Sequence, residues 1–163
     1  MVIVALDVGQ ARIGVALSDE LDLLASPHST IRRTSNAAAI AAIARVVAAS
    51  GAEQVVVGLP TSFDGKLHAQ ALAVQAFADK LRARLSVPLV YADETLSTVR
   101  AEEQLRAAGV RPDRIRERID AAAAAVILQE YLDARRQEQT RQTRPPATPP
   151  SDVDNSHPDV SEP

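Results

Sequence analysis

An apolar run near the start of the chain ends in a carboxylate: residues 2–9 read VIVALDVG. The β-branched residues predict a buried strand over residues 2–8. Because side chains alternate between the two faces of a strand, Asp7 lies on the same face as Ile3 and Ala5, which should point into the protein. A carboxylate there is costly to bury unless a partner such as a metal ion offsets its charge. The alternative is a hydrogen-bonded Asp at the turn of a hairpin.

A second apolar run follows, and we expect it to form a strand over residues 13–18. Gly9 and Gly14 allow a tight turn and a close approach of the backbone. The second strand is therefore predicted to fold back beside the first.

The remaining body alternates strands and helices. We expect a third strand at roughly 28–32, a helix from Ser35 or Asn36 to Gly51, a strand over 54–60, a long helix that includes 69–85, a strand over 88–94, a helix from Ser97 or Thr98 to near Gly109, and a last helix from Pro112 to about Arg136. Three connected strands followed by strand–helix–strand crossovers predict an α/β fold with a mixed sheet between helices. Aromatic residues make up only 2% of the chain, so the core must be aliphatic.

The chain of 163 residues is long enough for one domain with a normal core. We place that domain at 1–136 and interpret 137–163 as a disordered, acidic tail that holds six of the ten prolines. The net charge is -3, but the four acids after residue 144 leave residues 1–144 at +1. A near-neutral body neither supports nor excludes a nucleic-acid partner.

Three classes of protein are disfavoured by composition. The chain has no cysteine, which excludes disulfides, a thiol nucleophile and a cysteine zinc site. It has no run of about 18 apolar residues, so no membrane span is expected. A basic leader is also missing at the start, and we therefore expect a cytoplasmic protein.

Three acids at the ends of regular elements are candidates for chemistry: Asp7, Glu94 and Asp120. Asp93 and Glu94 point to opposite faces of their strand, and the pattern does not choose between them. Asp120 lies on the last helix above small residues, although an ordinary surface Asp is the alternative. Three converging carboxylates would suit Mg²⁺ or Mn²⁺. Two such ions activate water and stabilise the leaving oxygen in phosphodiester hydrolysis.

Basic residues near these acids are candidates for binding a nucleic-acid backbone. Arg114, Arg116 and Arg118 precede Asp120, and a solvated helix start is the alternative for them. Arg12 follows the Asp7 turn, and Lys66 is a weaker candidate in the loop after the fourth strand. With so few aromatic residues for base stacking, we expect recognition of backbone and shape.

Several segments occur in a specific order over residues 1 to about 134: LDVG at 6–9, RIGVA at 12–16, VGLP at 57–60, DG at 64–65, QA at 70–71, DE at 93–94, LST at 96–98, IDAAA at 119–123 and IL at 127–128. In this set the chain resembles the YqgF family of pre-16S rRNA nucleases, also described as Holliday junction resolvase-like proteins. The resemblance implies an RNase H-like five-stranded sheet and assigns metal binding and catalysis to Asp7, Glu94 and Asp120. It is the resemblance that selects Glu94 over Asp93.

The resemblance also implies an activity: trimming of the 5′ end of precursor 16S rRNA by a monomer or homodimer. Two positions depart from the family pattern, because Ala11 and Thr95 stand where basic residues are usual. One alternative is a resolvase that acts on branched DNA as a dimer. A second is a ribosome-assembly protein that binds RNA without catalysis. An actin-like ATPase also begins with a strand and Asp-x-Gly, but it needs two lobes and this chain has the length of one.

Overall fold

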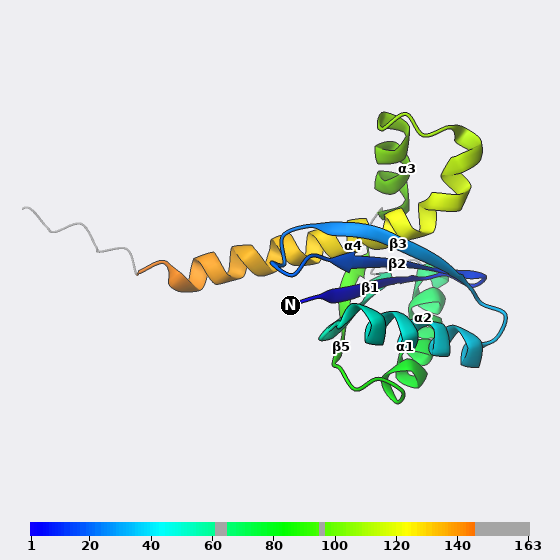
Figure 1. Ribbon diagram of the computed structural model, residues 1–163, viewed down its shortest axis with the longest axis horizontal. Helices are drawn as coiled ribbons and strands as arrows, with labels where there is room; N and C mark the ends of the chain where they lie inside the picture. The colour runs from blue at the N-terminus through cyan, green and yellow to red at the C-terminus, as the bar shows by residue number, and fades with distance from the viewer. Residues whose placement is uncertain (61–64, 95–96, 146–163) are drawn as a thin grey trace, which may run out of the picture.

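The computed structural model describes residues 1–60, 65–94 and 97–145 (Figure 1). The elements in chain order are β1 (Ile3–Val8), β2 (Arg12–Ser18), β3 (Ala25–Arg32), α1 (Asn36–Ser50), β4 (Gln54–Pro60), α2 (Gly65–Arg82), β5 (Leu89–Glu94), α3 (Ser97–Ala107) and α4 (Pro112–Thr143). Their order and types agree with the expectation from sequence.

The strands form one mixed sheet in the order β3-β2-β1-β4-β5. The pairs β1/β2 and β2/β3 are antiparallel, as a hairpin and a meander require, whereas β1/β4 and β4/β5 are parallel and are joined by helical crossovers. The predicted mixed five-stranded sheet is confirmed. The strand that carries Asp7 lies at its centre.

Helices cover both faces of the sheet (Figure 1). On one face α1 and α2 bury an aliphatic cluster that includes Val4, Leu6, Val55 and Val57. On the other face α4 packs through Ala124, Ile127 and Leu128 on the small layer formed by Ile3, Ala5 and Val56. The second helix of this side, α3, packs on α4 rather than on the sheet, through Ala101 and Ala122. Phe77 is the one aromatic residue among the buried hydrophobic residues of the described chain, so the core is aliphatic as expected.

Both ends of helix α1 are set by capping residues that can be recognised in the sequence. The Ser35 side chain accepts a hydrogen bond from the Ala38 N–H, and this satisfies one of the free donors of the first turn. At the other end Gly51 adopts a left-handed conformation with φ of 67° and stops the helix.

Three predicted boundaries are wrong. Helix α2 ends at Arg82 and does not reach residue 85, because the N–H groups of Arg84 and Leu85 close turns back to Leu81 and Arg82. Helix α4 continues to Thr143 rather than ending near Arg136, so the expected border between domain and tail falls inside a helix. Residues 137–143 are exposed and lack the apolar periodicity by which the helix was traced. Strand β3 begins at Ala25, ahead of the expected residue 28, and it includes Pro27. Proline is tolerated there because β3 is an edge strand of the sheet.

None of the helices in the described ranges is long and apolar enough to cross a membrane.

Candidate active site

The candidate site lies on the α4 face of the sheet, around Asp7. Asp7 shares this face with Ile3 and Ala5, which pack under α4. Its partner in the antiparallel ladder is Gly14 on β2. A side chain at position 14 would therefore also point toward α4. The sequence prediction that Asp7 faces the interior agrees with this position, and the side chain is half-buried.

Gly14 determines how closely α4 approaches Asp7. A Cβ atom at residue 14 would collide with the backbone carbonyl of Asp120. Because Gly14 has no side chain, the helix rests directly on the strand next to Asp7. The same contact holds Asp120 at the level of Asp7, although the two residues are far apart in the sequence.

Gly58 has the corresponding role on the other side of β1. A Cβ atom on Gly58 would lie 2.7 Å from Ile127 Cδ1 and 3.2 Å from Glu94 Oε2. The space above this glycine is therefore taken by the side chain of Glu94, the last residue of β5. Val90 and Ala92 of the same strand pack in the α4 layer, whereas Tyr91 packs in the opposite layer. Glu94 therefore points toward the Asp7 side of the sheet, and Asp93 does not.

The three carboxylates interact strongly enough to change the protonation of Asp7. The pKa of Asp7 is raised from 3.8 to about 8, chiefly by burial and then by the charge of Glu94, a hydrogen bond with Glu94 and the charge of Asp120. Since a protonated carboxyl can donate a hydrogen bond, neutral Asp7 donates to Glu94. Burial together with neighbouring like charges raises the pKa of carboxyl groups at many functional sites.

Asp120 has a different neighbour. Its Oδ2 atom forms an ion pair with Nε of Arg12 at 2.9 Å. The N–H of Arg12 does not point at this oxygen, and Asp120 Oδ2 is buried with no hydrogen-bond donor among the described residues. A buried oxygen with unused lone pairs is costly by itself but is suited to a cation.

These observations fit a divalent cation, although the ligands are not assembled around one point. Within residues 1–60, 65–94 and 97–145, no group of three His, Cys, Asp or Glu side chains has the spacing of a metal site. Instead, the guanidinium of Arg12 offsets the charge of Asp120, and the raised pKa of Asp7 favours a proton on that carboxyl group below about pH 8. A cation that replaces the proton would relieve the repulsion among Asp7, Glu94 and Asp120, which are hard oxygen ligands of the type that Mg²⁺ and Mn²⁺ prefer.

One residue that supports the site, Arg33, was not predicted from the sequence. Its Nη1 donates a hydrogen bond to the carbonyl oxygen of Gly9 at 2.7 Å, and its Nη2 donates to Asn36 Oδ1 at 2.9 Å. The guanidinium also stacks over the ring of Phe77, 4.7 Å from its centroid. Arg33 thus holds the turn that follows Asp7. The only signal in the sequence was its place at the end of a strand.

Of the basic residues predicted to bind the nucleic-acid backbone, the structure places some at the candidate site and others away from it. Arg12 lies at the site, next to Asp120. Arg114, Arg116 and Arg118 are exposed on the first turns of α4, and Arg114 pairs with Glu117 at 3.6 Å. Among them Arg116 precedes Asp120 by four residues and so shares its helix face. Lys66 lies at the start of α2, but its side chain is outside the described residues, as are Asp64 and Thr95.

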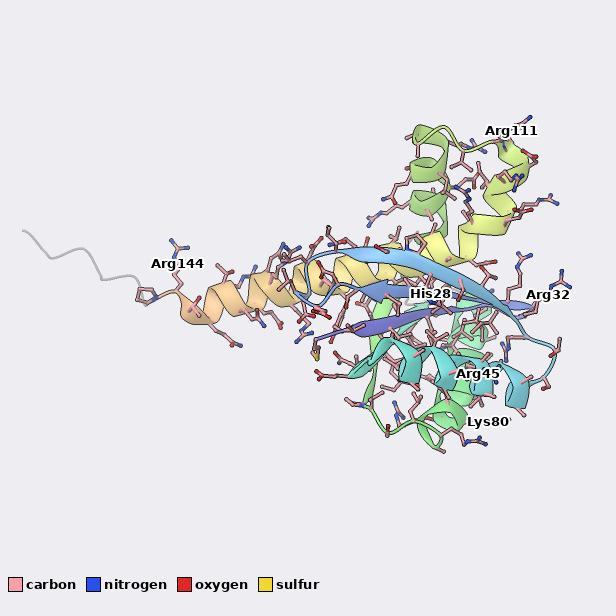
Figure 2. The ribbon with its side chains drawn as sticks, in the orientation of Figure 1. His28, Arg32, Arg45, Lys80, Arg111 and Arg144 are labelled. Carbon is pink, nitrogen blue, oxygen red and sulfur yellow. The ribbon has the colours of Figure 1, made fainter. Side chains whose placement is uncertain are left out.

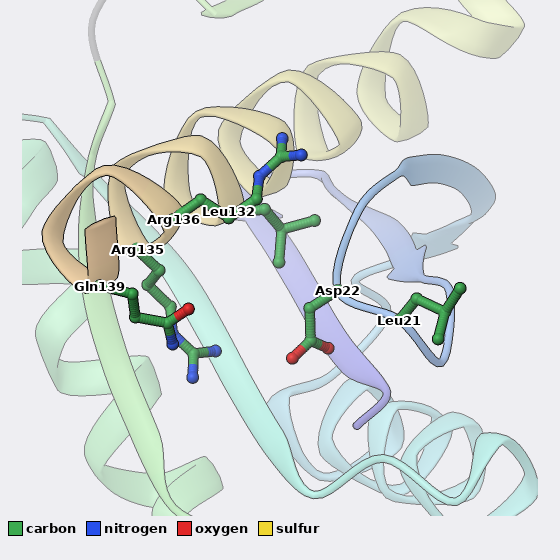
Figure 3. A pocket seen from close by; sticks show the side chains of 6 residues that line it. All are labelled: Leu21, Asp22, Leu132, Arg135, Arg136 and Gln139. Atoms are coloured by element: carbon green, nitrogen blue, oxygen red, sulfur yellow. The ribbon is translucent and has the colours of Figure 1, made fainter. Parts of the chain in front are cut away.

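A hollow elsewhere on the molecule does not belong to this site (Figure 3). It has a volume of about 110 Å³ and is lined by Leu21, Asp22, Leu132, Arg135, Arg136 and Gln139. Leu132 is three turns beyond Asp120 on α4, or roughly 18 Å along the helix axis.

Comparison with known proteins identifies the family. The model of the RuvX family, described as Holliday junction resolvase, matches residues 1–134. The chain belongs to this family. A RuvX relative from Chloroflexus aggregans, named "putative pre-16S rRNA nuclease", is 51% identical over 134 residues, which cover 82% of this chain and 94% of that protein. A relative of the same name from Moorella thermoacetica is 47% identical over 133 residues, covering 82% and 95%.

Solved structures agree with the fold of the RuvX family. RuvC from T. thermophilus in complex with a Holliday junction has a TM-score of 0.57 at 18% identity, covering 83% of this chain and 96% of that chain. The resolvase of fowlpox virus with its junction has a TM-score of 0.53 at 12% identity, covering 82% and 98%. The expected RNase H-like resolvase fold and the family resemblance are thus confirmed. As a member of this family the chain is a nuclease, a hydrolase that acts on phosphodiester bonds.

Proposed function

We propose that this protein cleaves precursor 16S rRNA near its 5′ end, with Mg²⁺ or Mn²⁺ held by Asp7, Glu94 and Asp120. The observation that carries the proposal is the gathering of these three carboxylates from β1, β5 and α4 on one face of the sheet. The names of the curated relatives support the choice of substrate. When bound, such ions activate water and stabilise the leaving oxygen of a phosphodiester.

The residues would divide the work according to their positions. Asp7 lies between the other two acids and must lose its proton before it can ligate a cation, so it is the central ligand. Glu94 and Asp120 complete the ligand set from either side. Arg12 is 52% exposed and is held beside Asp120, where its guanidinium can bind an oxygen of the reacting phosphate.

The proposed substrate can be tested by offering three labelled nucleic acids side by side: precursor 16S rRNA, linear duplex DNA and a four-way DNA junction. We expect cleavage of the rRNA close to the mature 5′ end. Asp7→Asn should reduce this rate to less than roughly a tenth, because the central charge that holds the cation is lost. Binding of the rRNA without cleavage by the wild-type protein would instead indicate a non-catalytic assembly protein.

The proposed cofactor is tested in the same assay by exchanging the ion. Mg²⁺ or Mn²⁺ should support cleavage, and excess chelator should abolish it. Ca²⁺ should be a poor substitute, because its longer bonds and higher coordination number place the ligands differently. Cleavage that continues in chelator would contradict a metal-dependent mechanism.

Resolution of Holliday junctions is the second candidate, favoured by the description of the family and by the fold shared with junction resolvases. That activity needs two sites in a homodimer, whereas a monomer is sufficient for trimming one RNA end. A stable dimer that nicks the junction symmetrically and ignores the rRNA would reverse our order of preference.

A further inference from the structure

Two arginines lie directly opposite each other on neighbouring strands beside the candidate site. In the antiparallel ladder between β2 and β3, Arg12 pairs with Arg32. Two residues further along β2, Gly14 pairs with Thr30 on one side and with Asp7 on the other. Two residues of strand span about 7 Å, so the arginine row lies one such step from the row of Asp7.

Both arginines belong to the face that carries the carboxylates. The residues between these rows, Ile13 and Ile31, pack into the layer under α1 and α2. Since successive side chains alternate, Arg12 and Arg32 must project from the opposite face, where α4 lies. The ion pair of Arg12 with Asp120 agrees with this direction. Figure 2 shows Arg32 at the end of the sheet, away from the helix α1 that carries Arg45.

Of the two arginines, only Arg12 has an acidic partner among the described residues. Arg12 has Asp120 as its partner, whereas the exposed side chain of Arg32 makes no ion pair or hydrogen bond with any residue in the described ranges. Like charges directly opposite on two strands destabilise a sheet. A charged residue on the edge strand β3 helps to prevent edge-to-edge pairing, but that purpose does not require a second cation across from it. An anionic ligand would supply the partner that Arg32 lacks and would reduce the repulsion between the two arginines.

We propose that Arg32 binds a phosphate of the nucleic-acid backbone and, with Arg12, guides the strand into the active site from the β2–β3 side. This inference rests on the proposed function, since it assumes that a nucleic acid occupies the face of Asp7. Arginine suits the task because its guanidinium is always charged and binds phosphate oxygens in a two-pronged manner. Contacts of this kind fix the register of the strand and carry no sequence information.

The test separates binding from cleavage. Binding of a labelled single-stranded RNA and of a four-way DNA junction is measured in the Asp7→Asn background, between about 50 and 200 mM salt. Arg32→Ala should weaken RNA binding about three- to tenfold and reduce the slope of log Kd against log salt by about 0.7, the loss of one phosphate contact. Arg32→Lys should restore most of the slope. Arg45→Ala, which removes the same charge from α1 behind the sheet, is the matched control and should leave both values unchanged.

Cleavage by the otherwise wild-type enzyme gives the second measurement. Arg32→Ala should raise KM with little change in kcat, because the contact positions the strand and does not touch the reacting atoms. Its melting temperature should stay level or rise, since a repulsion is removed. An unchanged salt slope, or an equal effect of Arg45→Ala, would overturn the assignment of Arg32 while the nuclease proposal stands. If the wild-type protein binds neither nucleic acid, the proposed function fails and this inference fails with it.

Discussion

Asp7 is a half-buried carboxyl group that the fold holds beside two other carboxylates. Its pKa is raised from 3.8 to about 8 in the folded protein. Between these values the folded state keeps a proton that the unfolded state releases, so this group makes stability fall as the pH rises from about 4 to about 8.

Asp7→Asn should remove this pH dependence. In chelator, the variant and the wild type should melt at similar temperatures at pH 5, and at pH 8 the variant should melt at least about 2 °C higher. Thermal unfolding across this pH range measures the difference. Mg²⁺ should then stabilise the wild type but not the variant, because the proposed cation site needs the charge of Asp7. A variant that melts below the wild type at pH 8 would show that the Asp7 carboxyl is not under electrostatic strain.

Glu94 and Asp93 offer a matched pair one residue apart. Glu94→Gln should reduce cleavage about as severely as Asp7→Asn, since its side chain lies over Gly58 toward the site. Asp93→Asn should leave most of the rate, because Asp93 is exposed and belongs to the other face of β5. Steady-state cleavage rates of both variants decide this, and equal losses would contradict the assignment of the strand faces.

At the scale of elements, the two glycines place α4 and β5 around Asp7 in different ways. Gly14→Ala should lower both the melting temperature and the cleavage rate, because the added methyl group meets the backbone of α4 and the helix must move. Gly58→Ala should cost less stability but still impair cleavage, because the methyl group meets the ends of two side chains, one of them Glu94. Thermal melts with parallel rate measurements test the contrast. A Gly14→Ala protein with unchanged stability would mean that the contact is not tight.

The elements that sequence predicted well are those with local signals. Helix α1 has a capping Ser35 and a left-handed Gly51, and β4 is an apolar run that ends at Pro60. The end of α4 was missed because apolar periodicity reports packing in the core, and residues 137–143 are all exposed although their Arg, Gln and Glu residues favour helix.

The sequence pattern along β5 left the choice between Asp93 and Glu94 open, because both faces of this strand are packed. Tyr91 packs on one side of the strand and Ala92 on the other, so both faces look apolar in the sequence and alternation gives no direction. The roles of Gly14 and Gly58 were also hidden. The importance of a glycine depends on what packs above it. Above Gly14 this is α4, more than a hundred residues later in the chain, and above Gly58 it is Glu94 at the end of β5.

At the scale of the whole molecule, the C-terminal part of α4 reaches beyond the sheet (Figure 1). Removal of residues 138–163 should change the melting temperature by less than about 5 °C and leave basal cleavage nearly unaltered, because residues 137–145 are exposed. Removal of residues 132–163 is the contrasting truncation, since it deletes Leu132, which is 1% exposed in the α4 layer. It should destabilise the domain clearly. Equal melting temperatures of the two truncated proteins would contradict this account of where the core ends.

The placement of the acids on the first strand and on α4 has a consequence for the newborn chain. Asp7 emerges from the ribosome early, and Asp120 follows only after the whole sheet has been synthesised. At about 5–20 residues per second, the interval is on the order of ten seconds. During that time the strands can begin to pair, but the set of acids is incomplete. If these acids hold the cation as proposed, a nascent chain without Asp120 would lack part of its ligand set, and cleavage would begin only once α4 has docked on the sheet.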